Sequence, residues 1–395
     1  MAKDPFAPIA SDKFTFGLWT LGNPGRDPFG EPTRATLSPA EIVDALGKAG
    51  GPTHGVYGVN FHDNDLIPID ASASETQQIK KSFKAALRRN KIRVPMATTN
   101  LFSDPVFKDG AFTSNDAEIR AYAIHKTMKA MQLGAEFGAK TYVFWGGREG
   151  AESDATKDPV LAVKRFRHAI NFLCKYNKDQ GFGYKFALEA KPNEPRGHIY
   201  FAVTGSYLAF IETLDHPEMV GVNPEFAHEN MAGLNFVHHV AQALEAGKLF
   251  HIDLNDQVMC RYDQDFRFGS SSYKQAFFLT KLLTDYKYKG PKHFDSHAYR
   301  QSDPKDVIEF ARGSMRSYKI LEHKVHQFNK DRKIQSLLGK INNENRKLES
   351  MMRKYSKTAA KDLLAMAFDR KKLAARPLPY EELDQRVFDL LMGVK

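Results

Sequence analysis

The sequence predicts an α/β fold, a (β/α)8 TIM barrel that is followed by an extended helical C-terminal arm. Eight short apolar runs alternate with segments of helical periodicity, and their starts lie 29 to 48 residues apart. The pattern changes after about residue 330, where polar helical stretches replace the runs. Strands that alternate with helices form parallel βα units, and eight such units close naturally into a barrel.

The eight runs are expected to be strands that are buried on both faces, because Val, Ile, Phe and Leu recur within them. In order they are FTFGLW (14–19), GVYGVNFH (55–62), RVPMATT (93–99), TYVFW (141–145), YKFALE (184–189), MVGVNPE (219–225), KLFHID (248–253) and PKHFD (291–295). Between them, helical patterns are expected at 116–137, 159–179, 229–246 and 272–286.

The C-terminal part is expected to be helical but without a core of its own. Segments 334–355 and 357–375 have thin apolar faces, Pro-Leu-Pro follows at 377–379, and 380–392 reads as one more helix. Such faces need a surface to pack on, either the barrel or another subunit. We therefore predict a catalytic barrel at residues 1–325 and a helical arm for subunit contacts at 326–395.

Composition and charge exclude several classes of protein. The chain is 42% hydrophobic over 395 residues, which is enough for a sizeable core, and no apolar run approaches the ~20 residues of a membrane span. It has two cysteines, Cys174 and Cys260, and its first twelve residues lack a secretory pattern, so we expect a cytoplasmic protein.

The net charge of +10 resides entirely in residues 319–376, which hold 16 basic and 6 acidic residues. No nucleic-acid-binding motif accompanies this charge, so neither a nucleic-acid nor a membrane partner is expected.

Four of the runs end in a carboxylate, at Glu189, Glu225, Asp253 and Asp295. The carboxyl ends of barrel strands meet at one rim, where the catalytic groups of such barrels lie. Four carboxylates in one place cannot all stay ionised without a cation, and oxygen ligands suit Mg²⁺ or Mn²⁺. The alternative, unrelated helix caps and salt bridges, explains one such residue more easily than four at equivalent positions.

A second cluster consists of Asp263, Asp265 and His228. In an extended segment, residues i and i+2 point to the same side, so the two aspartates can hold one ion. His228 lies three residues after Glu225, which could then bridge two ions that polarise two substrate oxygens. A lone Asp-X-Asp is by itself a weak signal.

His62 and Asp65 stand at the end of the second run, where a carboxylate could fix the imidazole tautomer and leave the other nitrogen for acid–base work. Lys191 could donate to a developing oxyanion, or could merely balance charge. Three aromatic residues near run ends, Trp19, Trp145 and Phe102, could exclude water from a rim site or belong to the core.

These motifs resemble those of the xylose isomerases, also called glucose isomerases, in the shorter class without an N-terminal extension. The resemblance covers residues 14 to about 320, and its stretches include VNFHDNDLIP, VPMATTNLFSDPVFKDGAFTSND, WGGREGAES, EAKPNEPRG, VNPEFAHENMAGLNF, KLFHIDLND and YDQDFRFG.

The resemblance implies a metal-dependent aldose–ketose isomerase that interconverts D-xylose and D-xylulose, and D-glucose and D-fructose, by ring opening and a hydride shift between C2 and C1. It implies two divalent cations per subunit, with Mg²⁺ expected and Mn²⁺ or Co²⁺ as alternatives. By motif, the first ion would be held by Glu189, Glu225, Asp253 and Asp295, and the second by Glu225, His228, Asp263 and Asp265.

The resemblance also implies roles for the remaining site residues. His62, oriented by Asp65, would assist ring opening, and Lys191 would hydrogen-bond the C1 oxygen. The family is tetrameric, with a C-terminal arm that embraces a partner, so a homotetramer is expected. The substrate-binding residues would be Trp19, Phe102 and Trp145 as pocket walls, Thr98 and Asn100 near the far end of the sugar, and Phe29 in a neighbouring subunit's site.

Three positions depart from the family pattern. His297 stands where a Lys is usual; we expect it near the substrate, partly replacing that charge and weakening activity below roughly pH 6.5 as it titrates. Ala190 replaces a common Pro, which would loosen the turn before Lys191. The loop 256–262 reads DQVMCRY instead of a Gly-rich, polar stretch, so the affinity or preference for the second metal could differ.

Two other classes of function remain open at this point. One is a hydrolytic metalloenzyme on a similar barrel, such as an abasic-site endonuclease, which the basic tail would favour. The other is a non-catalytic sugar-binding relative that has lost turnover through the changed loop and His297.

Overall fold

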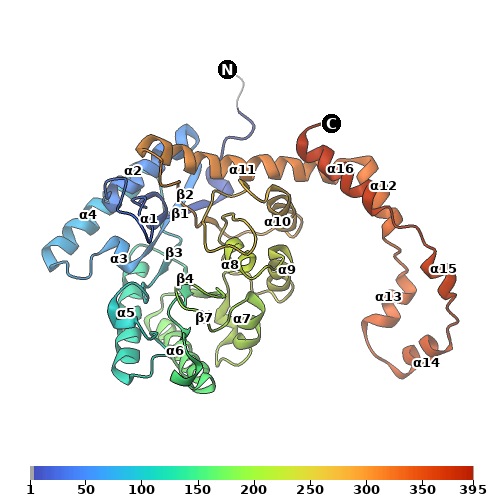
Figure 1. Cartoon of the computed structure of the whole chain (residues 1–395), viewed down its shortest axis with the longest axis horizontal. Coiled ribbons are helices and arrows are strands. Elements are labelled where there is room, and N and C mark those ends of the chain that lie inside the picture. Colours follow the sequence, from blue (N-terminus) through green and yellow to red (C-terminus); the bar gives the residue numbers. More distant parts are fainter. Residues whose placement is uncertain (1–3, 395) are drawn as a thin grey trace. The chain divides into compact units, whose positions relative to one another are not determined.

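The computed structural model describes residues 4–394, and the chain divides into two compact units, Met1–Leu321 and Glu322–Lys395. The first unit is built on seven parallel strands in the order β8-β6-β4-β3-β2-β1-β9 (Figure 1). Each lies within one of the runs expected to be strands. They are β1 (Phe14–Gly17), β2 (Val56–His62), β3 (Met96–Thr98), β4 (Thr141–Trp145), β6 (Lys185–Glu189), β8 (Val220–Val222) and β9 (Lys292–Phe294).

The run at 248–253 is not a regular strand, which corrects the expectation of eight. Isolated bridges join Leu249 to Val222 on one side and Asp253 to His293 on the other, so this segment closes the barrel between β8 and β9. One physical cause is Pro224, which follows β8 and has no N–H to donate to a ladder. Its carbonyl still accepts from the Asp253 N–H at 3.1 Å.

Helices surround the sheet, as a (β/α)8 barrel requires (Figure 1). The long ones are α2 (Pro39–Gly50), α4 (Ala73–Asn90), α5 (Ala117–Glu136), α6 (Pro159–Gln180), α9 (Phe236–Glu245), α10 (Tyr273–Asp285) and α11 (Pro304–Lys330). The short ones are α1 (Leu18–Leu21), α3 (Asp63–Leu66), α7 (Thr204–Ile211) and α8 (Phe226–Met231). A small antiparallel pair, β5 (Gly150–Ala151) and β7 (His198–Ile199), lies in the loops.

Three of the four helical patterns correspond to α5, α6 and α10, but the pattern at 229–246 covers two helices. The chain breaks at Gly233, whose φ of +72° belongs to the left-handed region that glycine tolerates. Asn235 then starts α9 by accepting a hydrogen bond from the Val237 N–H at 3.0 Å. The break ends α8 within two turns, just after His228.

Inside the barrel, the side chains of Met96, Val143 and Ala187 form a buried cluster against which Trp19 and Phe250 pack. These three residues come from the adjacent strands β3, β4 and β6, so the cluster lies beneath the rim at which those strands end.

The second unit, which begins within α11, is helical as expected, but the two long helices predicted for it are divided. Asn345 and Asp369 accept hydrogen bonds from the N–H groups of Lys347 and Lys372, and thereby start new helices inside the predicted ones. The helices are α12 (Arg332–Ile341), α13 (Arg346–Arg353), α14 (Lys357–Ala365), α15 (Arg370–Ala374) and α16 (Tyr380–Met392), the last as predicted.

Large apolar side chains of the second unit, such as Tyr355, Leu364 and Phe368, are exposed, and α13, α14 and α15 bury no residue. Between residues 4 and 394, none of the helices combines the length and apolarity that crossing a bilayer demands.

Barrel closure gives a prediction for Gly221, on β8. A Cβ atom there would lie 2.4 Å from the Lys248 carbonyl oxygen and 2.5 Å from the Phe250 ring, both in the irregular closing segment. We expect Gly221→Ala to destabilise the protein by about 1–3 kcal/mol, because the backbone of that segment must shift. Chemical denaturation followed by circular dichroism measures this.

The matched control is Gly205→Ala in α7, where the added Cβ would meet only the Gln242 side chain, at 3.3 Å. Alanine favours a helix over glycine by about 1 kcal/mol, so this variant should be at least as stable as the wild type. Equal stability of the two variants would show that closure does not depend on the close approach at Gly221.

Candidate active site

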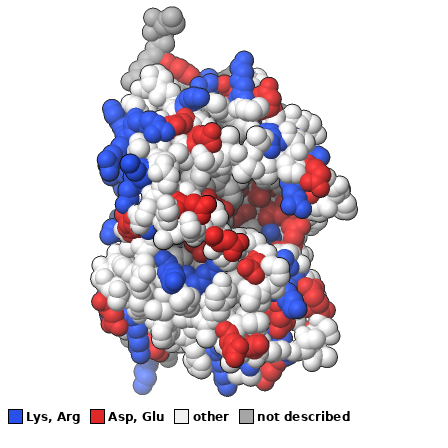
Figure 2. Space-filling view, turned by 90° about the vertical axis from the view of Figure 1, so that its left-hand side faces the viewer, with Lys and Arg blue, Asp and Glu red and all other residues white. Residues whose placement is uncertain are grey.

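A pocket of about 160 Å³ opens at the carboxyl ends of the strands, and acidic side chains gather in a hollow on one face of the molecule (Figure 2). Its lining includes thirteen of the seventeen predicted site residues, together with Met96 and Val143, which were not predicted. The thirteen are Trp19, His62, Thr98, Phe102, Trp145, Glu189, Lys191, Glu225, His228, Asp253, Asp263, Asp265 and Asp295.

The seven predicted metal-ligating residues lie together, and Glu225 is common to all their groupings. Within each of three groups, one potential ligand atom per residue lies within 4.8 Å of the others. The groups are Glu189, Glu225 and His228; Glu225, Asp253 and Asp295; and Glu225, Asp263 and Asp265. Glu225 is therefore positioned to be shared between two cations.

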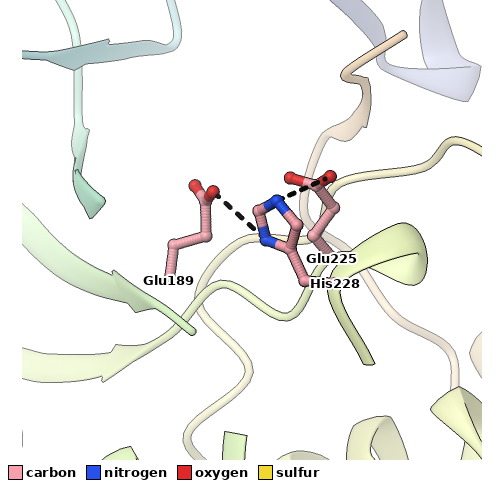
Figure 3. Close-up of side chains that lie close together, drawn as sticks. All are labelled: Glu189, Glu225 and His228. Atoms are coloured by element: carbon pink, nitrogen blue, oxygen red, sulfur yellow. Dashed lines mark ion pairs between the residues drawn. The ribbon is translucent and has the colours of Figure 1, made fainter. Parts of the chain in front are cut away.

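The fold explains how distant residues converge here. Glu189 is the last residue of β6, and Glu225 immediately precedes α8, whose first turn carries His228 (Figure 3). Asp253 ends the closing segment and Asp295 follows β9. The strand-end pattern in the sequence thus identifies residues that share one rim.

Two asparagines that sequence reasoning missed hold these carboxylates. The Asn223 amide donates to Glu189 Oε2 at 2.9 Å and to Asp253 Oδ2 at 2.7 Å. The Asn255 amide donates to Glu225 Oε1 at 2.7 Å and to Asp265 Oδ1 at 2.8 Å. Each lies two residues from an acidic strand end, a spacing that in extended chain places side chains on the same side.

His228 tests whether the site fits a cation. Its Nδ1 lies 3.0 Å from the Ala190 carbonyl oxygen, which fixes the proton on Nδ1. Burial lowers the pKa of His228, so the imidazole is neutral near pH 7. The lone pair of Nε2 then faces Glu225 Oε1 at 3.2 Å and Asp263 Oδ2 at 3.3 Å. Three acceptors facing one another fit a divalent cation between them.

The pKa values of the carboxyl groups also indicate that the site lacks positive charge. Burial and mutual repulsion raise the pKa values of Glu189, Glu225 and Asp265 well above their usual range. The same causes, with Asp253 as the main repelling charge, raise the pKa of Asp295 to about 7. Bound divalent cations would keep these groups ionised.

Two aspartates behave in the opposite way because each faces a basic group. Burial opposes ionisation of Asp263, but Lys191 and His228 together outweigh it and lower the pKa of that carboxyl. Burial is likewise outweighed at Asp253, whose pKa is lowered by His293 and His251. Each of these two aspartates also has one buried oxygen, Oδ1, without a hydrogen-bond partner among the described residues.

His62 and Asp65 form the predicted pair, with Nδ1 of the histidine 2.8 Å from Asp65 Oδ2. The same oxygen accepts the His62 backbone N–H at 3.0 Å, so the carboxylate holds both the ring and the chain. Burial disfavours the imidazolium, but Asp65 outweighs it and raises the pKa of His62. Asp65 itself does not line the pocket, whereas His62 does.

Lys191 and the aromatic residues occupy the remaining walls. Lys191 Nζ donates to Asp263 Oδ2 at 2.7 Å and lies 5.2 Å from the centre of the Trp145 ring. The Phe102 ring centroid is 4.6 Å from that of Trp145 and 5.5 Å from that of His62. Trp19 packs on His62 at 4.4 Å and donates from Nε1 to Asp295 Oδ1 at 2.6 Å.

Two predicted substrate-binding residues lie outside the pocket lining of this chain. Phe29 is 99% exposed, as a residue that reaches into another subunit would be. His297 is half-buried with Nδ1 3.1 Å from the Ala298 carbonyl oxygen, and burial lowers its pKa. Burial therefore works against a charge on His297, and its partial replacement of the usual lysine stays a prediction.

Asn100 also does not line the pocket, but its side chain organises the loop that carries Phe102. Cys260, in the altered loop, is exposed and likewise absent from the lining. Met96 and Val143 were missed because apolar residues within a buried strand give no signal that separates a pocket floor from core.

The fold and site together define a metal-binding TIM-barrel enzyme, and comparison with known proteins makes this specific. Residues 53–318 match the model of the xylose isomerase-like TIM barrel family. The xylose isomerase of Thermus thermophilus is 57% identical over 334 residues, which is 85% of each chain. That of Thermus caldophilus is 50% identical over 390 residues, or 99% of this chain and 100% of its own.

The chain belongs to the xylose isomerase family, and it is an isomerase enzyme. Distant solved structures support the fold alone. A putative xylose isomerase from Rhodospirillum rubrum has a TM-score of 0.59 at 14% identity, covering 78% of this chain and 98% of its own. D-allulose 3-epimerase from a Methylomonas species has a TM-score of 0.52 at 17% identity, covering 82% and 99%.

The raised carboxyl pKa values predict how stability depends on pH in a chelator. Glu189, Glu225 and Asp265 hold protons in the folded state that the unfolded state has already released. Stability should therefore fall as the pH rises above 7, by roughly 1.4 kcal/mol per pH unit for each carboxyl that stays protonated when folded. Urea unfolding at several pH values, with and without Mg²⁺, measures this.

Two controls separate the carboxylates from other groups. With Mg²⁺ present the fall should disappear, and Glu225→Gln should make it shallower in the chelator. The buried histidines whose pKa is lowered, such as His228 and His293, gain no charge in this window. A constant or rising stability in the chelator would mean that these carboxyl groups do not repel one another as described.

Proposed function

We propose that this protein interconverts D-xylose and D-xylulose, and D-glucose and D-fructose, by opening the sugar ring and shifting a hydride between C2 and C1. The observation that carries this proposal is the sharing of Glu225 by three groups of potential cation ligands, beside a pocket walled by Trp19, Phe102 and Trp145. Relatives named xylose isomerase at 57% and 50% identity supply the substrate class.

The donor set supports two divalent cations per subunit, with Mg²⁺ proposed and Mn²⁺ or Co²⁺ as alternatives, because it contains six carboxylates and one imidazole. When bound, two such cations would polarise the substrate oxygens on C1 and C2, the two carbons between which the hydride moves. The first would be held by Glu189, Glu225, Asp253 and Asp295, and the second by Glu225, His228, Asp263 and Asp265.

Ring opening is assigned to His62. Because Asp65 accepts from Nδ1, the other ring nitrogen, Nε2, is free to exchange a proton with the sugar. The raised pKa of His62 keeps that nitrogen able to donate near neutral pH. Trp19 and Phe102 both pack against the His62 ring and restrict its orientation.

Lys191 is assigned to the C1 oxygen. It is buried, and although burial opposes its charge, Asp263 outweighs this and raises the pKa of the ammonium group. A permanently charged donor can stabilise negative charge that develops on a substrate oxygen. Thr98, which also lines the pocket, is assigned to the far end of the sugar.

We further propose a homotetramer in the cytoplasm. The exposed apolar side chains of the predicted arm at 326–395 need a surface to pack on, and a second copy of the chain would supply it. Phe29, nearly fully exposed, would reach a neighbouring subunit's site.

The test of the proposal is ketose formation from D-xylose by protein stripped with a chelator. We expect no product until Mg²⁺, Mn²⁺ or Co²⁺ is added. Glu225→Gln should lower kcat by ~100-fold or more with each metal, because it removes a charge shared by all the ligand groups. Activity that persists in the chelator would contradict the assignment of the metal site.

A second prediction concerns His62. His62→Gln should lower kcat/KM by ~10²- to 10⁴-fold, the range of general acid–base catalysis, without changing the Mg²⁺ concentration needed for half-maximal stabilisation. Asp65→Asn should act in the same direction but less strongly, since it disturbs only the orientation of the ring. Thermal unfolding with increasing Mg²⁺ and steady-state kinetics measure the two effects. Unchanged kinetics in both variants would remove His62 from the mechanism.

The two alternative classes are less well supported. Zinc-dependent hydrolases depend on several histidine ligands. The pocket lining contains two histidines, His62 and His228, among its described residues. Cleavage of abasic DNA at low salt would revive the first alternative. Sugar binding without ketose formation, in protein loaded with metal, would indicate a non-catalytic relative.

A further inference from the structure

A largely buried ion pair between Asp63 and Lys126 lies outside the residues considered so far. Asp63 follows His62 directly and opens α3, and its Oδ2 accepts a hydrogen bond from Lys126 Nζ. Lys126 projects from α5, and its side chain is 8% exposed, while that of Asp63 is 14% exposed. Lysine is almost never this deeply buried unless it is paired.

The two oxygens of Asp63 bind different parts of the chain. While Oδ2 takes the Lys126 ammonium group, Oδ1 accepts the backbone N–H of Asn100 at 2.8 Å. Lys126 also donates to Asn64 Oδ1 at 3.1 Å. The pair therefore joins three elements: the turn after β2, the segment after β3, and helix α5.

The segment after β3 carries the part of the wall that contacts His62. Asn100 Oδ1 accepts from the N–H of Phe102 at 3.2 Å and from Ser103 at 3.0 Å, which fixes a tight turn. The Phe102 ring then lies 5.5 Å from the ring of His62. Asp63, adjacent in sequence to His62 and hydrogen-bonded to Asn100, therefore links the two segments that carry these side chains.

We propose that Lys126 is a positioning residue for the sugar pocket: through Asp63 and Asn100 it holds Phe102 against His62. A lysine here has a specific effect, since it compensates the charge of a carboxylate that must stay buried next to His62. This inference rests on the proposed function, because it concerns the same sugar site. It assigns Lys126 no contact with the substrate.

The test compares Lys126→Met with the wild type in the metal-loaded enzyme, at a temperature well below unfolding of either. We expect kcat/KM for D-xylose to fall ~10- to 100-fold, the loss typical of a misplaced binding group. The Mg²⁺ concentration for half-maximal activation should not change, since the proposed metal ligands come from other strands. A purely structural role would instead lower the unfolding temperature and leave kcat/KM unchanged.

An independent measurement uses intrinsic fluorescence. The chain has two tryptophans, Trp19 and Trp145, and both line the pocket. Phe102 contacts Trp145, so its displacement in Lys126→Met should increase quenching of the emission by acrylamide. Unaltered quenching together with unaltered kcat/KM would overturn the proposal.

Three further variants complete the experiment. Lys126→Arg retains the charge and should keep most of the activity. Lys126→Met combined with Asp63→Asn removes the unpaired carboxylate but keeps an acceptor for Asn100, so it should recover part of kcat/KM. If Lys126→Met alone does not fold, this double variant serves as the test, and wild-type kinetics in it would overturn the proposal.

The matched control is Lys129→Met. Lys129 is exposed on the same helix, and this variant should match the wild type.

The outcome is separable from that of the proposed function. An inactive wild type would refute the isomerase proposal itself, and the quenching comparison would still test the positioning. An active wild type with an equally active, folded Lys126→Met variant would refute only the inference about Lys126.

Discussion

The constraint on which this structure depends is the repulsion among six carboxylates, three buried and three half-buried, that meet around Glu225. A parallel barrel brings strand ends to one rim, and here that geometry concentrates negative charge where water cannot screen it. Part of that negative charge is stabilised by direct hydrogen bonds to the carboxylates. The donors are the side-chain amides of Asn223 and Asn255 and the ammonium group of Lys191. The remaining deficit appears as raised pKa values and as unpartnered carboxylate oxygens, and divalent cations are the ligands that such a deficit favours.

The irregular segment that closes the barrel contributes to this concentration of carboxylates. Where a regular ladder would continue beyond β8, Pro224 interrupts it, and an isolated bridge pairs Glu225 with Asp253 instead. Two acidic residues thus lie side by side on neighbouring segments, an arrangement that a regular sheet would oppose because like charges opposite each other destabilise strand pairing. The sheet is therefore irregular at the point where Glu225 and Asp253 are brought together.

Sequence patterns were sufficient for the barrel and for most of the pocket, because a strand that ends in Glu or Asp is both unusual and easy to recognise. They were insufficient where the outcome depends on contacts between distant segments. Asn223 and Asn255 carry no charge and could equally have been turn residues. The periodicity of 229–246 continues through Gly233, so the break after α8 depends on local backbone freedom. Likewise, the lowered pKa of His297 follows from its burial, which its place two residues after Asp295 does not reveal.

The rim divides into two chemically distinct halves. Strands β1 to β4 lead to Trp19, His62, Phe102 and Trp145, whereas β6, β8, the closing segment and β9 lead to the carboxylates. At one junction Trp19 Nε1 donates to Asp295 at 2.6 Å, and at the other Lys191 lies 5.2 Å from the Trp145 ring. A sugar offers both a carbon face and a row of oxygens, and a rim with one aromatic and one anionic half can bind both at once. The two halves contact each other at these junctions. A change that moves the aromatic wall therefore shifts the sugar oxygens relative to the anionic half, even when every carboxylate stays in place.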